Sequence, residues 1–256
     1  MSEELREFEA RRGELLGVLE EGAKLAREVG SESIAERIEG EEIQRLRSGS
    51  FHLVVVGEFN HGKTSFVNAL LGKPLLPVGV TPTTAIIHHV VHGEEPSARL
   101  VFADGSETPL AVEELSRFSA QDIEASEDNR NSGVRERPPS YLELSYPSEL
   151  LESSITLVDT PGVNDLSLTR AEITYGYIPR SDAVLFLLDA GQPLKESERR
   201  FLEQQLLERS RDKILFVVTK ADIWSADERE QALGYIEGRL KKLVRQPKLF
   251  AVSAQE

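Results

Sequence analysis

The sequence contains no cysteine, which excludes disulfide bonds and thiolate metal sites. It also lacks any apolar run near the roughly 20 residues that a membrane-spanning helix needs. The longest apolar run, around Ala183–Leu188, has the length of a strand. The N-terminus, MSEELREFEA, is acidic and has no apolar stretch of the kind found in secretory signals. These absences fit a cytoplasmic protein.

Basic charge is also scarce, because 30 lysine and arginine residues face 44 aspartate and glutamate residues and give a formal net charge of −14. Proteins that bind RNA or DNA over a broad surface use a basic face, since neutralising phosphates supplies most of their affinity. We therefore expect no nucleic-acid partner. The same acidity argues against this region holding an anionic membrane by charge alone.

The N-terminal residues 2–47 have the pattern of an amphipathic helix. Gly30 is expected to end one helix and Ser31 to cap the next. We assign residues 1–48 to a helical segment and residues 49–256 to a separate domain. The apolar stripe of the helix either packs on that domain or requires another partner. Its members recur at three- and four-residue steps: Leu5, Phe8, Leu15, Leu16, Leu19, Ala23, Ala26 and Val29.

From Phe51 onward, apolar runs of strand length alternate with helical patterns. This alternation predicts an α/β domain with a mainly parallel sheet flanked by helices. The apolar runs are 51–56, 155–158, 183–188, 214–218 and 249–252, and the helical patterns include 64–71, 195–209 and 226–243.

An insertion at residues 97–146 interrupts this alternation. It begins with a hairpin that turns at Asp104-Gly105. A short helix at 112–118, a mobile polar loop at 121–138 and a half-exposed strand at 141–146 are expected to follow.

Residues 57–64, GEFNHGKT, fit the phosphate-binding loop (P-loop) pattern G-x-x-x-x-G-K-[ST]. The loop follows an apolar strand and opens a helix, so its backbone N–H groups and the helix N-terminus can point at phosphate oxygens. Lys63 would bridge the β- and γ-phosphates, and the Thr64 hydroxyl would ligate Mg²⁺. The residues expected to contact the nucleotide here are Gly57, Asn60, His61, Gly62, Lys63, Thr64 and Ser65.

A second motif, LVDTPG at 157–162, places Asp159 at the end of an apolar strand, where ligands bind in open α/β sheets. Asp159 is expected to hold Mg²⁺, and the Gly162 N–H is expected to contact the γ-phosphate. Val163 and Asn164 come next, so no glutamine follows this motif to position water as in Ras-type enzymes.

The loop VTPTTA at 80–85 supplies threonines that could complete the Mg²⁺ shell only while the γ-phosphate is present. Thr84 is the first candidate, followed by Thr83 and then Thr81. The expected metal ligands are thus Thr64, Thr84 and Asp159. Lys63, Thr83, Thr84 and Gly162 form the expected catalytic set, which would act by positioning and electrostatics.

The histidines at positions 88, 89 and 92 lie in one apolar run. Strand alternation would place the two adjacent ones on opposite faces, and no carboxylate or cysteine spacing accompanies them. We therefore favour structural roles for these histidines.

The strand ILFVV at 214–218 leads into T-K-A-D, and this motif predicts guanine recognition. The Asp222 carboxylate can accept hydrogen bonds from the ring N–H and the exocyclic amine of guanine, a donor pair that adenine lacks. The stem of Lys220 would cover the base, with Thr219 beside it. Ser253-Ala254, after the last apolar run, would supply a backbone N–H to the guanine carbonyl. These elements together favour GTP over ATP as the substrate.

The chain resembles the dynamin superfamily, most closely the bacterial dynamin-like proteins, over about residues 45–256. The stretches that carry the resemblance are GEFNHGKTSFVNALLG, PTTA, LVDTPGVND, SDAVLFLLDA and TKADI. The resemblance implies a large Mg²⁺-dependent GTPase with weak nucleotide affinity, for which a monovalent cation is a further candidate cofactor. It implies that two heads dimerise across the nucleotide face, either as two copies or with a related chain, and that this speeds hydrolysis and drives membrane remodelling. Residues 2–47 would be one part of a neck bundle.

Two departures from the family pattern matter. Eukaryotic dynamins carry Gln-Ser where this chain has Phe59 and Asn60, which leaves the hydrolysis rate and its dependence on dimerisation open. The sequence also stops shortly after Ser253-Ala254, where the family continues with neck helices and a membrane-binding stalk. We expect either a piece of a longer, peripherally membrane-associated protein or a chain whose neck a partner completes.

Three other functions fit the motifs less well. The first is a nucleotide-gated scaffold or switch with little turnover, which the residues at positions 59 and 60 would allow. The second is an Era-type ribosome-linked GTPase, against which the net charge and the insertion argue. The third is an ATP-dependent P-loop enzyme, which would require the TKAD motif to be accidental.

Overall fold

The computed structural model separates the chain into two compact units, Met1–Ser50 and Phe51–Glu256. Most of the expected helix at 112–118, the polar loop at 121–138 and the threonine-bearing loop at 80–85 lie outside the described residues. The structure describes residues 3–78, 86–112, 115, 139–152, 154–163, 174–207 and 213–254.

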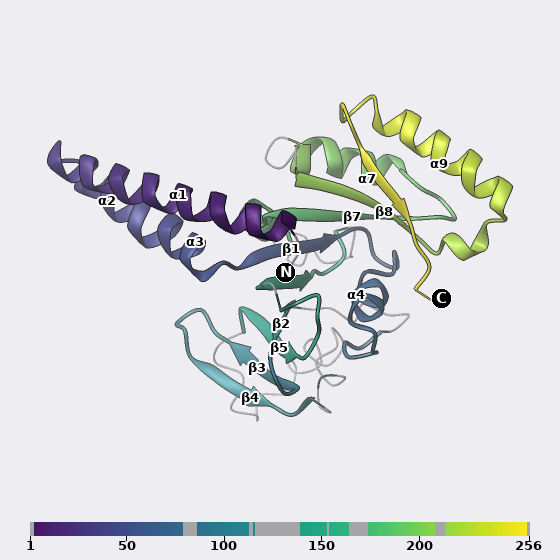
Figure 1. Cartoon of the computed structure of the whole chain (residues 1–256). Coiled ribbons are helices and arrows are strands. Elements are labelled where there is room, and N and C mark those ends of the chain that lie inside the picture. The colour runs from purple at the N-terminus through teal and green to yellow at the C-terminus, as the bar shows by residue number, and fades with distance from the viewer. Residues whose placement is uncertain are drawn as a thin grey trace. The chain divides into compact units, whose positions relative to one another are not determined.

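The first unit is a helical hairpin whose long helix packs along a second, irregular helical arm (Figure 1). The chain reverses at Gly30, whose φ of 76° is left-handed. There the Gly30 N–H donates to Arg27 O at 2.9 Å and the Ser31 N–H donates to Ala26 O at 2.8 Å. The expected break at Gly30-Ser31 is confirmed, although the Ser31 side chain makes no capping bond. The elements are α1 (Glu3–Glu28), α2 (Glu32–Arg37), the π-helical η1 (Ile38–Ile43) and α3 (Gln44–Ser48).

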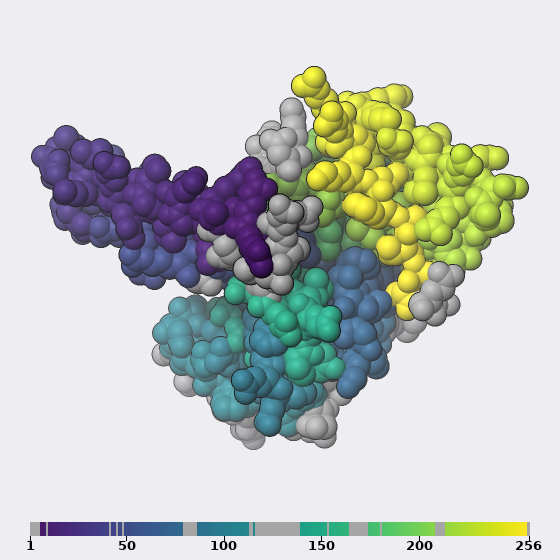
Figure 2. Space-filling view, in the orientation of Figure 1, coloured from purple at the N-terminus to yellow at the C-terminus, as the bar shows by residue number. Residues whose placement is uncertain are grey.

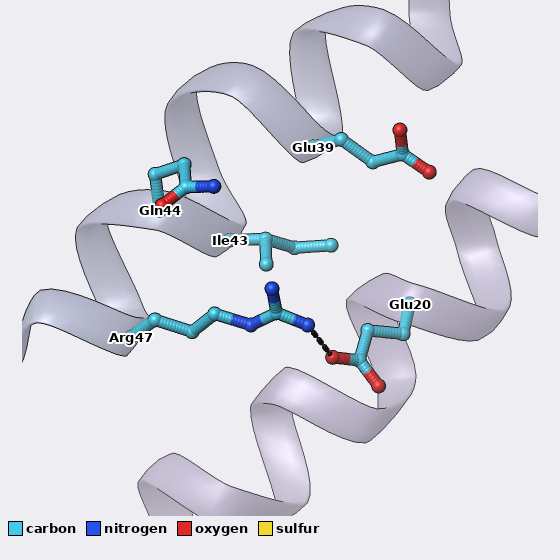
Figure 3. Close-up of a pocket in the computed structure, with 5 residues that line it drawn as sticks. All are labelled: Glu20, Glu39, Ile43, Gln44 and Arg47. Atoms are coloured by element: carbon cyan, nitrogen blue, oxygen red, sulfur yellow. Dashed lines mark hydrogen bonds and ion pairs between the residues drawn. The ribbon is translucent and has the colours of Figure 1, made fainter.

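Ion pairs span the groove between α1 and the second arm of this hairpin. Arg47 Nη2 lies 2.6 Å from Glu20 Oε1 (Figure 3), and Arg27 makes a two-pronged pair with Glu39 at 2.5 and 2.6 Å. Because these groups are largely exposed, each pair adds little to stability. They border a cavity of about 280 Å³ lined by Glu20, Glu39, Ile43, Gln44 and Arg47.

The apolar stripe of α1 is only partly covered. Of the stripe residues, Phe8 and Leu15 in α1 and Val29 just after it are exposed, by 47 to 77%; Val18 and Leu25, which lie on α1 outside the stripe, are exposed as well. The described hydrophobic residues buried in this unit are Ala23, Ala35 and Ile43. No described helix, in either unit, is long and apolar enough to cross a membrane.

In the second unit the described strands form one nine-stranded sheet in the order β4-β3-β5-β2-β6-β1-β7-β8-β9. The half from β6 to β9 is entirely parallel. In the other half, β2 runs antiparallel to β6, and it pairs in parallel with β5. The strands are β1 (Phe51–Val56), β2 (Ile87–His92), β3 (Ser97–Val101), β4 (Glu107–Leu110), β5 (Tyr141–Tyr146), β6 (Ile155–Asp159), β7 (Ala183–Asp189), β8 (Ile214–Thr219) and β9 (Lys248–Ala251). The expected α/β fold with a mainly parallel sheet is confirmed.

The expected hairpin is confirmed as β3 and β4, which pair antiparallel at one edge of the sheet. Its turn contains Gly105 with a left-handed φ of 79°. The Asp104 carboxylate accepts the Ser106 N–H at 3.0 Å, which fixes the turn locally.

Two hydrophobic clusters lie on opposite faces of the sheet, as strand alternation requires. Along β1, Val54 and Val56 join one cluster and Val55 joins the other. The first face is covered by α7 (Glu196–Phe201), the π-helical η4 (Leu202–Leu206) and α9 (Ala226–Leu240), and the second by α4 (Lys63–Leu71) (Figure 1). The C-terminal part of the chain, which contains α9 and β9 and is coloured yellow-green to yellow, forms a continuous region of the surface in Figure 2.

Phe186 on β7 provides a test of this core, because it is fully buried, with ring centroids 5.8 Å from Phe201 and 5.9 Å from Phe216. We expect Phe186→Ala to lower the free energy of unfolding by about 3–5 kcal/mol through lost burial and a cavity. Denaturant unfolding would measure this. The control is Phe250→Ala on β9, a residue 53% exposed, which should change stability little. Equal losses for the two variants would contradict this description of the core.

Candidate functional site

The P-loop leaves β1 at Val56 and ends where α4 begins. Gly57 is tightly packed, since a Cβ added there would lie 2.9 Å from the Leu187 carbonyl oxygen on β7. Asn60 and Gly62 both have left-handed backbone, with φ of 63° and 72°. Gly62 is the N-cap of α4. These constraints curl the loop in front of the helix N-terminus, where backbone N–H groups attract anions.

The structure brings together the expected phosphate-binding lysine and two of the three expected metal ligands, Thr64 and Asp159. Lys63 is 7% exposed, and its Nζ donates to the Glu58 carbonyl at 2.8 Å. The Thr64 hydroxyl donates to Asp159 Oδ2 at 2.8 Å, a buried hydrogen bond between α4 and the end of β6. Ser65, one residue further along α4, is half-buried.

The hydroxyl of Thr64 and the carboxylate of Asp159 could provide two protein ligands of a Mg²⁺ site. Both are hard oxygen donors, and Mg²⁺ in nucleotide sites takes one or two protein oxygens with waters and substrate phosphates completing the shell. Among the described residues no group of three histidines, aspartates or glutamates could hold a metal by itself. The third expected ligand, Thr84, lies outside the described residues with Thr81 and Thr83.

The D-T-P-G segment packs directly on the P-loop. Thr160 Oγ1 donates to the Val55 carbonyl at 2.7 Å, and the Val163 N–H donates to the Gly57 carbonyl at 3.2 Å. A Cβ added to Gly162 would lie 2.9 Å from both N and Cα of Phe59. Only glycine fits this contact without movement of the backbone.

The histidines of β2 make different contacts. His88 is buried, with Nδ1 3.8 Å from Asp159 Oδ2. His89 stacks on Tyr141 with ring centroids 4.0 Å apart, and burial lowers its pKa to about 3. His92, at the strand end, is exposed. The packing of His89 fits the structural role expected for it.

The T-K-A-D motif lies where β8 ends, next to the P-loop. Thr219 Oγ1 is 2.9 Å from the His61 carbonyl and 3.1 Å from the Leu188 carbonyl, so its proton is shared between them. Lys220 has a left-handed φ of 58°, and its Nζ donates to the Asn60 carbonyl at 2.8 Å. The T-K-A-D motif therefore holds the P-loop backbone at two successive carbonyls.

Asp222 lies exposed on the short turn η6 (Ala221–Ile223). The Ala221 N–H donates to the Val252 carbonyl at 3.1 Å, which ties this turn to the end of β9. Ser253 and Ala254 follow there, and the side chain of Ala254 is exposed. The two segments expected to read the base thus meet at adjacent strand ends.

Sequence reasoning missed a buried group of ionisable side chains behind the P-loop. His61 Nδ1 lies 3.2 Å from Glu198 Oε1, and both residues are at most 2% exposed. Burial raises the pKa of Glu198 to about 7 and lowers the pKa of His61 to about 4. Glu58 and Lys195 border the pair, with Lys195 Nζ 3.7 Å from Glu58 Oε2.

Sequence reasoning also gave no role to Asp189, whose Oδ2 lies 2.5 Å from Lys220 Nζ. A signal for it was present, because Asp189 ends a buried apolar run just as Asp159 does. No comparable local signal exists for the pair His61 and Glu198, which are far apart in the sequence.

Several known proteins are similar to this chain in sequence. A family model described as the dynamin family matches residues 53–221. A protein in the xynA 3′ region of Caldicellulosiruptor sp. (strain Rt8B.4) is 30% identical over 234 residues, covering 91% of this chain and 56% of that protein. The bacterial dynamin-like protein of Nostoc punctiforme is 34% identical over 165 residues, covering 64% of this chain and 24% of that protein. This chain therefore corresponds to about half, or less, of these relatives.

A similar solved structure comes from an oligomerised bacterial dynamin pair described as a mechanism for long-range sensing and tethering of membranes. It matches with a TM-score of 0.61 at 23% identity and covers 96% of this chain and 38% of that one. At this identity the match establishes a common fold.

The buried pair behind the P-loop leads to a prediction about stability and pH. Between pH 4.5 and 7 native Glu198 keeps a proton that the unfolded chain has lost, so its contribution to stability falls as pH rises. Between pH 4 and 6.5 native His61 is neutral while the unfolded chain is protonated there, so its contribution rises with pH. We expect Glu198→Gln to match the wild type near pH 4 and to have a higher thermal midpoint at about pH 8.

Thermal unfolding without nucleotide would check this prediction. The control is Glu196→Gln on the same helix, whose carboxylate is exposed and has a pKa lowered by hydrogen bonds from Arg199 and Arg200. This control should gain nothing at the higher pH. A Glu198→Gln midpoint that stays at the wild-type value across the range would show that the buried carboxyl is not protonated as described.

Proposed function

The chain belongs to the dynamin family and carries its GTPase domain, and we propose that it binds GTP with Mg²⁺ and hydrolyses it to GDP and phosphate. The observation that carries this proposal is the buried hydrogen bond between Thr64 and Asp159 beside Lys63. It joins two groups that the chemistry of phosphoryl transfer requires next to a helix N-terminus, and Lys63 supplies a third beside them.

In this proposal the phosphates lie in the curl of the P-loop. Lys63 exchanges its hydrogen bond to the Glu58 carbonyl for phosphate oxygens and neutralises charge on the β- and γ-phosphates. Thr64 and Asp159 would hold Mg²⁺, and Thr84, or in its place Thr83, would complete the shell while the γ-phosphate is present. The metal supplies charge neutralisation to the phosphates in the transition state.

Water activation is assigned to Gly162 and the 81–84 loop. Gly162, already packed on the P-loop, would donate its N–H to the γ-phosphate, and together with it a backbone carbonyl or a hydroxyl of the 81–84 loop would orient the attacking water. Phe59, the neighbour of Gly162, stands where eukaryotic family members carry glutamine. Because of this difference, the second candidate function is a nucleotide-gated scaffold or switch that binds GTP but hydrolyses it slowly.

Guanine specificity is assigned to the ends of β8 and β9. Asp222 accepts the two N–H donors of the guanine edge, the stem of Lys220 covers the ring, and Ser253-Ala254 offers a backbone N–H. The exposure of Asp222 on η6 and the hydrogen bond from Ala221 to Val252 support this assignment.

In the complete protein we propose that heads dimerise across the nucleotide face and that this stimulates hydrolysis coupled to membrane remodelling. The uncovered apolar residues of α1 support a neck in which helices from outside the first unit cover this stripe. The similar solved structure is described as an oligomerised pair that senses and tethers membranes, and this description supports both dimerisation and a role at membranes. Membrane association would be peripheral.

Hydrolysis per molecule, measured over a wide range of protein concentration with Mg²⁺ and with sodium or potassium, tests the proposed enzyme. We expect the specific activity to rise with concentration, because a dimer would complete the site. Lys63→Ala should remove turnover at every concentration. A flat rate near zero together with tight GTP binding would instead favour the scaffold.

Base recognition is tested by Asp222→Asn. We expect its affinity for GTP to fall by about a hundredfold or more and its preference to move toward xanthine nucleotides, whose C2 carbonyl can accept from an asparagine amide. Competition among the triphosphates would measure this. Asp227→Asn, the matched change in the first turn of α9, should leave the preference for guanine intact. Unchanged GTP affinity in Asp222→Asn would refute the assignment.

A further inference from the structure

We propose that Asp189 is a positioning residue that fixes the Lys220 side chain and thereby sets the affinity for guanine nucleotides. This inference rests on the proposed nucleotide site and extends it to a strand that carries none of the residues assigned so far. It concerns binding, because the Asp189 carboxylate lies beside the expected base-covering lysine rather than beside the expected metal ligands.

Lys220 lies where three segments meet. Its ammonium donates to the Asn60 carbonyl at 2.8 Å and to Asp189 Oδ2 at 2.5 Å. Asp189 is the last residue of β7 and pairs in register with Thr219, the last residue of β8. One lysine therefore links the P-loop to the ends of two neighbouring strands.

The Asp189 carboxylate is itself fixed. Its Oδ1 accepts the Gly191 N–H at 2.8 Å, so the other oxygen is left aimed at Lys220. Burial would raise the pKa of Asp189, but hydrogen bonds from Lys220 and Gly191 outweigh it and hold the pKa below its usual value. The carboxylate is thus ionised at neutral pH and acts as a fixed acceptor.

Stability alone does not account for this arrangement. The Lys220 side chain is 40% exposed and the Asp189 side chain is 19% exposed, and ion pairs that remain open to solvent contribute only modestly to folding. Two features carry a cost instead: Lys220 and its acceptor Asn60 both have left-handed backbone, which non-glycine residues rarely adopt and which clusters at ligand sites. The structure holds these features together at the place where the base is expected.

Positioning matters for lysine because its stem is flexible. A lysine held in place before the ligand arrives loses less conformational entropy on binding. Its methylene groups can then lie flat against a purine without further ordering. The carboxylate of Asp189 would therefore strengthen binding without touching the nucleotide.

Asp189→Asn isolates this effect because it keeps the shape of the side chain. The amide oxygen can still accept the Gly191 N–H, but the group facing Lys220 is then an NH₂ donor, which cannot accept from the ammonium. We expect roughly five- to twentyfold weaker binding of fluorescent N-methylanthraniloyl GDP, mainly through faster release. In GTP turnover the KM should rise while kcat stays near the wild-type value, the signature of lost uniform binding.

A double-mutant cycle separates positioning from a general structural effect. In the Lys220→Met background, Asp189→Asn should produce no further loss of GDP affinity, because the group it acts on is gone. The matched control is Asp182→Asn. Asp182 immediately precedes the first residue of β7, at the end of the strand opposite to Asp189, so this change should leave the GDP affinity unchanged. Thermal unfolding of each variant without nucleotide would report any loss of fold.

An equal loss of affinity in both backgrounds would overturn the positioning role, as would an Asp189→Asn variant that binds GDP like the wild type. If the wild-type chain bound no guanine nucleotide, that result would refute the proposed function, and the inference that rests on it would be refuted as well. A non-additive cycle in a normally binding wild type would support the inference.

Discussion

The P-loop backbone is held from outside by the ends of neighbouring strands, and the rest of the site depends on this. A loop whose N–H groups turn inward toward a ligand cannot stabilise itself with those groups. Its outer side is fixed instead: Gly57 packs on a β7 carbonyl and Phe59 on the glycine of D-T-P-G. The carbonyls of Asn60 and His61 accept hydrogen bonds from Lys220 and the threonine before it. The P-loop is therefore fixed by contacts with β7, the D-T-P-G segment and the T-K-A-D motif.

The topology of the sheet explains why these contacts are possible. The strands β6, β1, β7 and β8 are adjacent and parallel, so their carboxyl ends lie in one row, where ligands bind in open α/β sheets. Asp159 ends β6, Asp189 ends β7 and Thr219 ends β8, while the P-loop itself follows β1. The antiparallel β2 begins a separate half that enlarges the sheet without interrupting this row. The hairpin of β3 and β4 lies at the edge of the sheet, so an insertion there leaves the row of parallel strand ends unchanged.

Features set by short stretches of sequence could be predicted, and features set by long-range contacts could not. The strands, the hairpin at Asp104-Gly105 and the break at Gly30 follow from local periodicity and turn chemistry. The meeting of Thr64 and Asp159 was foreseeable because Thr64 lies in the first turn of the helix after the P-loop and Asp159 ends a strand, each within a known motif. The pairing of His61 with Glu198 depends on how α7 packs behind the P-loop, and no pattern along the chain encodes that distance.

Charge on the scale of the whole chain and charge at the site oppose each other. A net charge of −14 repels an anionic nucleotide at long range, although screening limits that repulsion to about 10 Å at ordinary salt. In the proposed function, binding would therefore come from local groups: the buried ammonium of Lys63, the N-terminus of α4 and backbone N–H groups of the P-loop. Such groups act only on a phosphate already in the P-loop, so a rigid loop matters more here than electrostatic steering. We therefore expect the contacts that fix the P-loop backbone, rather than surface charge, to govern the affinity for the nucleotide.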